Sequence, residues 1–118
     1  MRDSARSVLV VDDDEDVRDS VALILRDEGY QVETAGNGKE ALDMLERIPP
    51  PGAVLLDLMM PVMNGWSTLE ALRKRGPVPP VVIVSAAVRP PPPGIAGYLR
   101  KPIDVEALLQ KLSDVMRQ

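Results

Sequence analysis

The 118-residue sequence contains no cysteine and no histidine. The absence of cysteine excludes disulfides, thiol nucleophiles and thiolate metal sites. The absence of histidine excludes a serine–histidine triad, imidazole metal ligands and acid–base catalysis by imidazole. A metal bound by this chain must therefore be a hard cation held by oxygen, for which Mg²⁺ and Ca²⁺ are the natural candidates.

Long apolar runs and an excess of positive charge are also missing. No stretch reaches the roughly 18 consecutive apolar residues that span a bilayer, and the N-terminal MRDSARS lacks the apolar segment of a signal peptide. We therefore expect a cytoplasmic protein with no membrane partner. The formal net charge of −4 argues against direct nucleic-acid binding, because no basic stripe is present to neutralise phosphates.

Five short apolar runs are bounded by turn signals, and three of them are nearly continuous valine, leucine and isoleucine. Such runs predict strands buried on both faces of a parallel sheet. Helix-like segments separate most of them, which indicates a doubly wound α/β fold. The predicted strands are 7–11, 31–35, 53–58, 81–86 and 97–102, and the predicted helices are 15–28, 38–48, 66–75 and 104–117. We expect one domain, residues 1–118, with a core of about 7–117.

Acidic, hydroxyl and amine side chains stand at the ends of these strands. Asp12 and Asp13 follow the first strand, and Asp57 ends the third. Ser85 ends the fourth, and Lys101 ends the fifth. Because ligands of such sheets bind outside the carboxyl ends of the strands, we expect these groups to meet there. Crowded carboxylates raise one another's pKa unless a cation offsets them, so the set suits Mg²⁺-assisted phosphoryl transfer onto a carboxylate.

Taken singly, these residues carry little information. Acidic residues after a strand commonly cap the next helix, as we expect of Asp14, Glu15 or Asp16. Serine ends many strands, and a lone lysine is commonly a solvated surface residue. Their joint placement at the ends of four strands of one sheet is what favours a functional site.

The motifs around these residues resemble those of the receiver domain of bacterial two-component response regulators. In chain order they are VLVVDDD (8–14), NGKEAL (37–42), LLDLMMPVMNG (55–65), VIVSA (82–86) and YLRKP (98–102), with Asp57 44 positions after Asp13. The resemblance covers residues 7–117. It implies a flavodoxin-like sheet of five parallel strands in the order 2-1-3-4-5.

The resemblance also implies a phosphoacceptor and a metal site. Asp57 would take a phosphoryl group from a sensor histidine kinase, a phosphotransfer protein or a small donor such as acetyl phosphate. Mg²⁺ or Mn²⁺ would be bound by Asp12, Asp13, Asp57 and the backbone carbonyl of Met59. The chain would catalyse only its own phosphorylation and dephosphorylation, and it would switch an unidentified output partner.

Further residues take roles from the same resemblance. Lys101 and Ser85 would contact the phosphoryl group, and Tyr98 would be an aromatic switch that turns inward when the hydroxyl moves. The Lys101–Pro102 peptide bond would be cis. Met59 and Ala87 occupy positions that tune the lifetime of the phosphorylated state in the family. Since neither is an acid or an amide, we expect slow autodephosphorylation.

A run of four prolines, Pro90–Pro93, stands where the fourth helix of the family belongs. Proline lacks the N–H donor and clashes with the preceding turn of a helix, so the run predicts a shortened helix or a Pro-rich loop in its place. An extended segment of ten residues, 87–96, spans roughly 30 Å. That length crosses a strand of about 17–20 Å. Because this helix forms part of the usual output and dimer face of the family, we expect altered output.

Three alternatives differ from a phosphoacceptor. One is a receiver-like interaction module that works without phosphorylation, although such a module has no reason to keep the five site residues together. A second is a phosphatase of the haloacid dehalogenase type, whose Asp-x-Asp nucleophile follows the first strand. An FMN site of the flavodoxin type lacks its phosphate-binding loop here. We expect either a stand-alone receiver or one cut from a longer protein.

Overall fold

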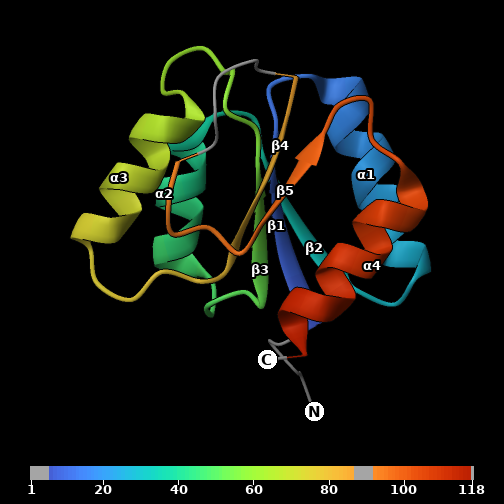
Figure 1. Cartoon of the computed structure of the whole chain (residues 1–118). Coiled ribbons are helices and arrows are strands. Elements are labelled where there is room, and N and C mark those ends of the chain that lie inside the picture. Colours follow the sequence, from blue (N-terminus) through green and yellow to red (C-terminus); the bar gives the residue numbers. More distant parts are fainter. Residues whose placement is uncertain (1–5, 87–91, 118) are drawn as a thin grey trace.

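The computed structural model of this chain describes residues 6–86 and 92–117, and it contains a sheet of five parallel strands (Figure 1). The strand order is β2-β1-β3-β4-β5. Their bounds are β1 Ser7–Val11, β2 Gln31–Ala35, β3 Ala53–Leu56, β4 Val81–Ser85 and β5 Gly97–Arg100. Every neighbouring pair is parallel. The predicted doubly wound, flavodoxin-like fold is thus confirmed.

In the described part of the chain, two helices cover each face of the sheet. The helices α1 (Glu15–Asp27) and α4 (Val105–Met116) lie on one face, and α2 (Gly38–Arg47) and α3 (Gly65–Lys74) lie on the other (Figure 1). Strand β1 packs against helices on both of its faces, which explains its nearly continuous apolar sequence. Val8 and Val10 pack with the α1 and α4 side chains, whereas Leu9 and Val11 pack with those of α2 and α3. Both faces of the strand are therefore buried.

Short polar side chains fix where the helices begin. Each helix follows an Asp or Asn whose side-chain oxygen accepts a backbone N–H of the first turn, which satisfies one of the unpaired donors there. The caps are Asp14, Asn37, Asn64 and Asp104. Asp14 is therefore the capping residue among the three acidic residues that the sequence offered.

The strand ends differ slightly from those predicted. Strand β3 ends at Leu56 rather than at 58, and β5 ends at Arg100 rather than at 102. Asp57 and Lys101 are therefore the first residues after their strands. At those positions the backbone no longer needs to alternate across the sheet, so both side chains are free to turn toward the carboxyl edge.

The crossover between β4 and β5 contains no helix among its described residues, 86 and 92–96. Ile95 is partly buried against the core side chains of the α2 and α3 face. Arg73 of α3 donates a hydrogen bond to the carbonyl of Pro93, and Ala96 N–H donates to Val81. Ala87, Pro90 and Pro91 lie outside the described residues, so this part of the Pro-rich prediction is not described.

Two glycines let the loop after β3 fold tightly beneath Asp57. A Cβ added to Gly65 would lie 2.5 Å from the carbonyl oxygen of Asp57, and one added to Gly38 would lie 1.8 Å from Oγ1 of Thr68. Both contacts leave room for hydrogen only. The NG pairs of the two sequence motifs therefore serve close backbone packing. No helix among the described residues is long and apolar enough to cross a bilayer.

Candidate functional site

Asp57 is held at the carboxyl end of the central strand β3. Its backbone N–H continues the ladder to β1 by donating to the carbonyl of Val11 at 3.0 Å. Its side chain is only 5% exposed. Oδ1 accepts the backbone N–H of Met59 at 3.1 Å, and Oδ2 accepts the ammonium of Lys101 at 3.1 Å. The carboxylate is thus fixed in direction before any ligand arrives.

Asp12 occupies the matching place at the end of β1. Its backbone N–H donates to the carbonyl of Ala35 on β2 at 3.1 Å. Oδ1 accepts the N–H of Asp14 at 2.9 Å, and Oδ2 accepts the ammonium of Lys101 at 2.8 Å. Lys101 therefore bridges Asp12 and Asp57 and offsets part of their mutual repulsion.

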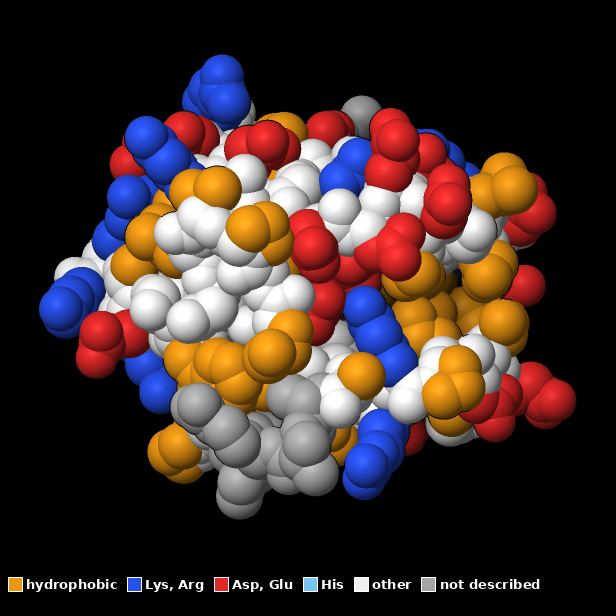
Figure 2. All heavy atoms as spheres, turned by 90° about the horizontal axis from the view of Figure 1, so that it is seen from above, with side chains coloured by type: hydrophobic (Ala, Val, Ile, Leu, Met, Phe, Trp, Pro, Cys, Tyr) orange, Lys and Arg blue, Asp and Glu red, His pale blue; other side chains and the backbone are white. Residues whose placement is uncertain are grey.

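Asp13 completes an acidic cluster with these two residues. Asp12, Asp13 and Asp57 each offer a carboxylate oxygen within 4.8 Å of the others. The first and the last are buried, whereas Asp13 is exposed. Acidic side chains gather near the middle of this face beside a basic one (Figure 2). An all-oxygen donor set that is open to water on one side fits Mg²⁺, which keeps several waters.

The pKa values of the buried Asp57 and the partly buried Lys101 are shifted. Burial raises the pKa of Asp57 and the nearby charge of Asp12 adds to this, although Met59 N–H and Lys101 act in the opposite direction. Burial lowers the pKa of Lys101, but the hydrogen bond to Asp12 and the charges of both carboxylates together raise it by more. The net shift of the Lys101 pKa is therefore upward. The Lys101 ammonium, which the two carboxylates share, stays charged. It does not fully cancel the rise that burial causes in the pKa of Asp57.

These shifts predict that Asp57 destabilises the metal-free fold at neutral pH. Because the pKa of Asp57 is raised, the stability it contributes is present below its unfolded pKa of about 4. That contribution is lost as the pH rises through the folded value. We expect Asp57→Asn to increase the free energy of unfolding near pH 7 by about 0.5–2 kcal/mol, with the gain shrinking toward pH 4.

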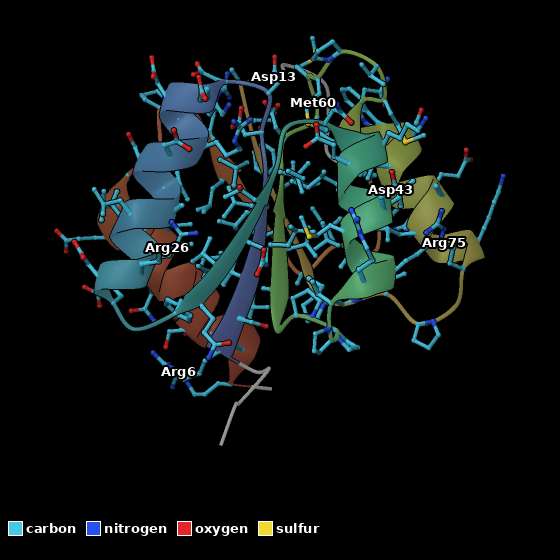
Figure 3. The ribbon with its side chains drawn as sticks, turned by 180° about the vertical axis from the view of Figure 1, so that it is seen from behind. Arg6, Asp13, Arg26, Asp43, Met60 and Arg75 are labelled. Carbon is cyan, nitrogen blue, oxygen red and sulfur yellow. The ribbon has the colours of Figure 1, made fainter. Side chains whose placement is uncertain are left out.

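The measurement is urea unfolding at both pH values in metal-free buffer. Asp43→Asn is the matched control, since Asp43 is exposed on α2 and lies apart from Asp13 (Figure 3). A gain from Asp57→Asn that is independent of pH, or a loss of stability near pH 7, would contradict the prediction.

The remaining predicted site residues lie along β4 and β5. Ser85 is fully buried at the end of β4, and its carbonyl accepts the N–H of Lys101 at 3.1 Å. Tyr98 is half-buried opposite Ile83 and packs against the core on the α2 and α3 face. The Lys101–Pro102 peptide bond is cis, the isomer that the resemblance implied. The structure thus brings the backbone of Ser85 against Lys101, whereas Tyr98 lies further back along β5.

Two features of the site were not foreseen from the sequence. Met59 and Met60 are neighbours in the loop after Asp57, but Met59 is 60% exposed whereas Met60 is buried. Arg18 of α1 donates a hydrogen bond to the backbone carbonyl of Asp12 at 3.1 Å. No sequence signal marks such a contact, because every residue has a backbone carbonyl and any residue type could be the acceptor.

The fold and the residues at its carboxyl edge define a signalling domain of two-component systems. The family model described as the response regulator receiver domain matches residues 8–113. The chain belongs to this family. Receiver domains are signalling modules, and the family binds Mg²⁺ at an acidic pocket.

Individual relatives agree with the family model. Response regulator MprA of Mycolicibacterium vanbaalenii is 38% identical over 117 residues, which cover 94% of this chain and 50% of that protein. A putative NtrX-like response regulator of Rickettsia bellii is 38% identical over 110 residues, which cover 86% of this chain and 23% of that protein. The chain therefore spans half or less of the length of these curated relatives.

Solved structures show the same architecture over nearly the whole chain. A CheY-like response regulator receiver domain protein from Methanospirillum hungatei superposes with a TM-score of 0.82 at 33% identity, covering 95% of this chain and 98% of that one. The receiver domain of the Francisella response regulator 1452 gives a TM-score of 0.85 at 28% identity, with 95% and 97% covered.

Proposed function

We propose that residues 1–118 form one receiver domain that accepts a phosphoryl group on Asp57 in an Mg²⁺-dependent reaction and thereby switches a partner. The observation that carries the proposal is the placement of a buried, pre-oriented Asp57 carboxylate 3.1 Å from Lys101 and within 4.8 Å of two further carboxylates. A protein promotes phosphoryl transfer mainly by positioning the reacting groups and stabilising their charge. This site supplies both without a histidine or a cysteine.

Each residue of the site has a separate role in the proposed transfer. A carboxylate oxygen of Asp57 forms the new bond to phosphorus while the donor's P–N or P–O bond breaks, and the donor leaves with that electron pair. Lys101 then transfers its contact from the carboxylate to the phosphoryl oxygens. Asp12, Asp13, Asp57 and the carbonyl of Met59 would hold Mg²⁺, which would neutralise charge on the carboxylates and on the phosphoryl group.

The proposed switch runs from Ser85 to the crossover that follows β4. Ser85 would donate its hydroxyl to the phosphoryl group, and Tyr98 would change its packing when Ser85 moves. Because the Pro90–Pro93 run disfavours the helix that forms part of the family's usual output face, we expect the output of this chain to be altered. The donor would be a sensor histidine kinase or a phosphotransfer protein, and we place this exchange in the cytoplasm.

Intact-protein mass after incubation with acetyl phosphate tests this proposal. We expect a single phosphoryl adduct in the presence of Mg²⁺ or Mn²⁺ and none when EDTA removes the metal. If the folded chain binds the metal but gains no adduct from acetyl phosphate or a phosphorylated donor protein, the proposal is wrong. A phosphorylation-independent interaction module would then be the better interpretation.

The phosphorylated form is expected to be long-lived. The Met59 side chain is exposed beside the acceptor, yet its thioether is only a weak hydrogen-bond acceptor and cannot activate a water. Ala87, at the second tuning position, lies outside the described residues. We expect a half-life well above seconds, measured by intact mass after removal of the donor, and a shorter one for Met59→Glu. Loss of the phosphoryl group within seconds from the unaltered chain would refute this.

A further inference from the structure

Arg18 connects α1 to the acidic loop that carries two of the three clustered carboxylates. Its Nη1 donates to the carbonyl of Asp12 at 3.1 Å, and its side chain is mostly buried. The guanidinium also lies against the turn after β2, since a Cβ added to Gly36 would be 3.1 Å from Nη1. Its ion pair with Glu15 is 4.0 Å long and Glu15 is exposed, so that pair contributes little. The bond to Asp12 is the contact that matters.

That carbonyl belongs to the same planar peptide unit as the N–H of Asp13. The Asp12 side of this unit is already fixed, because Ala35, Asp14 and Lys101 hold the backbone N–H and the carboxylate of Asp12. Asp13 differs from its neighbour. Within the described ranges, no hydrogen bond or ion pair holds its exposed carboxylate. The direction of the Asp13 side chain is therefore set by its backbone, and Arg18 holds the peptide unit that precedes it.

We propose that Arg18 is a positioning residue for the metal site. By holding the carbonyl of Asp12, it orients the peptide unit from which Asp13 extends and so keeps the Asp13 carboxylate near that of Asp57. The inference rests on the proposed metal site and adds to it a residue on α1. Arg18 also brings a positive charge toward the carboxylates, which by itself would repel a cation. Removing Arg18 would relieve this repulsion but would also release the carbonyl of Asp12, and we expect the second effect on affinity to be the larger one.

The same helix offers a matched control. Arg26 of α1 donates from Nη2 to the carbonyl of Val32 at 3.0 Å. Each of the two arginines thus joins α1 to a backbone carbonyl six residues away in the sequence, that of Asp12 just after β1 and that of Val32 within β2. Arg26 lies further along α1, away from the end of the sheet that carries Asp13 (Figure 3). Loss of either arginine removes one hydrogen bond from α1 to the backbone of another segment, but of the two only Arg18 contacts the acidic loop.

The experiment is a titration of Mn²⁺ into the full chain, with free Mn²⁺ followed by electron paramagnetic resonance. We expect Arg18→Met to weaken Mn²⁺ binding about 10-fold, as is typical when a residue that orients a ligand is lost. Arg26→Met should leave the affinity unchanged, although thermal unfolding should show similar losses of stability for both variants. In an Asp13→Asn background, Arg18→Met should have no further effect on Mn²⁺ affinity, because Arg18 acts through Asp13.

Three results would overturn the inference while the unaltered chain still binds Mn²⁺. They are unchanged or tighter binding by Arg18→Met, an equal loss in Arg26→Met, and a full additional loss in the Asp13→Asn background. Tighter binding would assign Arg18 a purely electrostatic role. If the unaltered chain binds no Mn²⁺, the proposed metal site itself is wrong, and the inference about Arg18 is overturned together with it.

Discussion

Replacement of Asp57 by asparagine is expected to abolish formation of the phosphoryl adduct while leaving the chain folded. Asparagine keeps the size of the side chain and an oxygen that accepts the N–H of Met59, but its amide has no anionic oxygen to attack phosphorus. The buried position should tolerate the change, since burial already raises the pKa of the Asp57 carboxyl. Intact mass after incubation with acetyl phosphate and Mg²⁺ measures the effect.

The controls separate loss of the acceptor from loss of the site. Asp43→Asn removes an exposed carboxylate of α2 and should be phosphorylated like the unaltered chain. Asp13→Asn keeps the acceptor and should be phosphorylated slowly, because only its contribution to metal binding is lost. An undiminished adduct in Asp57→Asn would show that a different residue accepts the phosphoryl group.

Replacement of Lys101 by methionine is expected to slow phosphorylation by about 100-fold or more. Lys101 is the cation that contacts both Asp12 and Asp57 among the described residues, and in the proposed transfer its ammonium stabilises charge on the transferred group. Removing one such preorganised donor from an enzyme site typically costs about 10²–10³ in rate. Mn²⁺ affinity should not fall, because a cation that competes for the same two carboxylates is removed.

The rate of adduct formation at saturating Mg²⁺ measures this effect, and the Mn²⁺ titration measures the second one. Lys39→Met removes an exposed lysine of α2 and should change neither quantity. Lys101→Arg keeps the charge but changes the geometry of the donors, so it should recover only part of the rate. Phosphorylation of Lys101→Met at the rate of the unaltered chain would remove Lys101 from the proposed transfer.

The fold and the membership of the acidic cluster could be predicted from the sequence because both depend on periodicity and position. The apolar side chains on both faces of β1 and β4 can be buried only between two layers of helices. Parallel strands bring their carboxyl ends to one edge of the sheet. Asp12, Asp57 and Lys101 follow from that rule as soon as the strands are placed. The hydrogen bonds that join Lys101 to both carboxylates show that its side chain lies at this edge as well.

Other features could not be predicted because they depend on side-chain direction or on backbone contacts. The opposite exposures of Met59 and Met60 arise in an irregular loop, where neither helical nor strand periodicity applies. The bond from Arg18 to the carbonyl of Asp12 requires no particular residue type at its acceptor. The end of β3 at Leu56 and the 2.5 Å separation between a Cβ added to Gly65 and the carbonyl oxygen of Asp57 are details of the backbone that only the three-dimensional structure shows.

Borohydride trapping tests the central claim most directly, because it identifies the acceptor residue in the unaltered chain. Reduction of an aspartyl phosphate yields homoserine, which peptide mapping by mass spectrometry locates. After incubation with acetyl phosphate and Mg²⁺, we predict homoserine at position 57 alone, and none when EDTA is present. Homoserine at another acidic position, or a phosphoryl adduct that resists borohydride and persists in EDTA, would contradict the assignment of Asp57 as the metal-dependent acceptor.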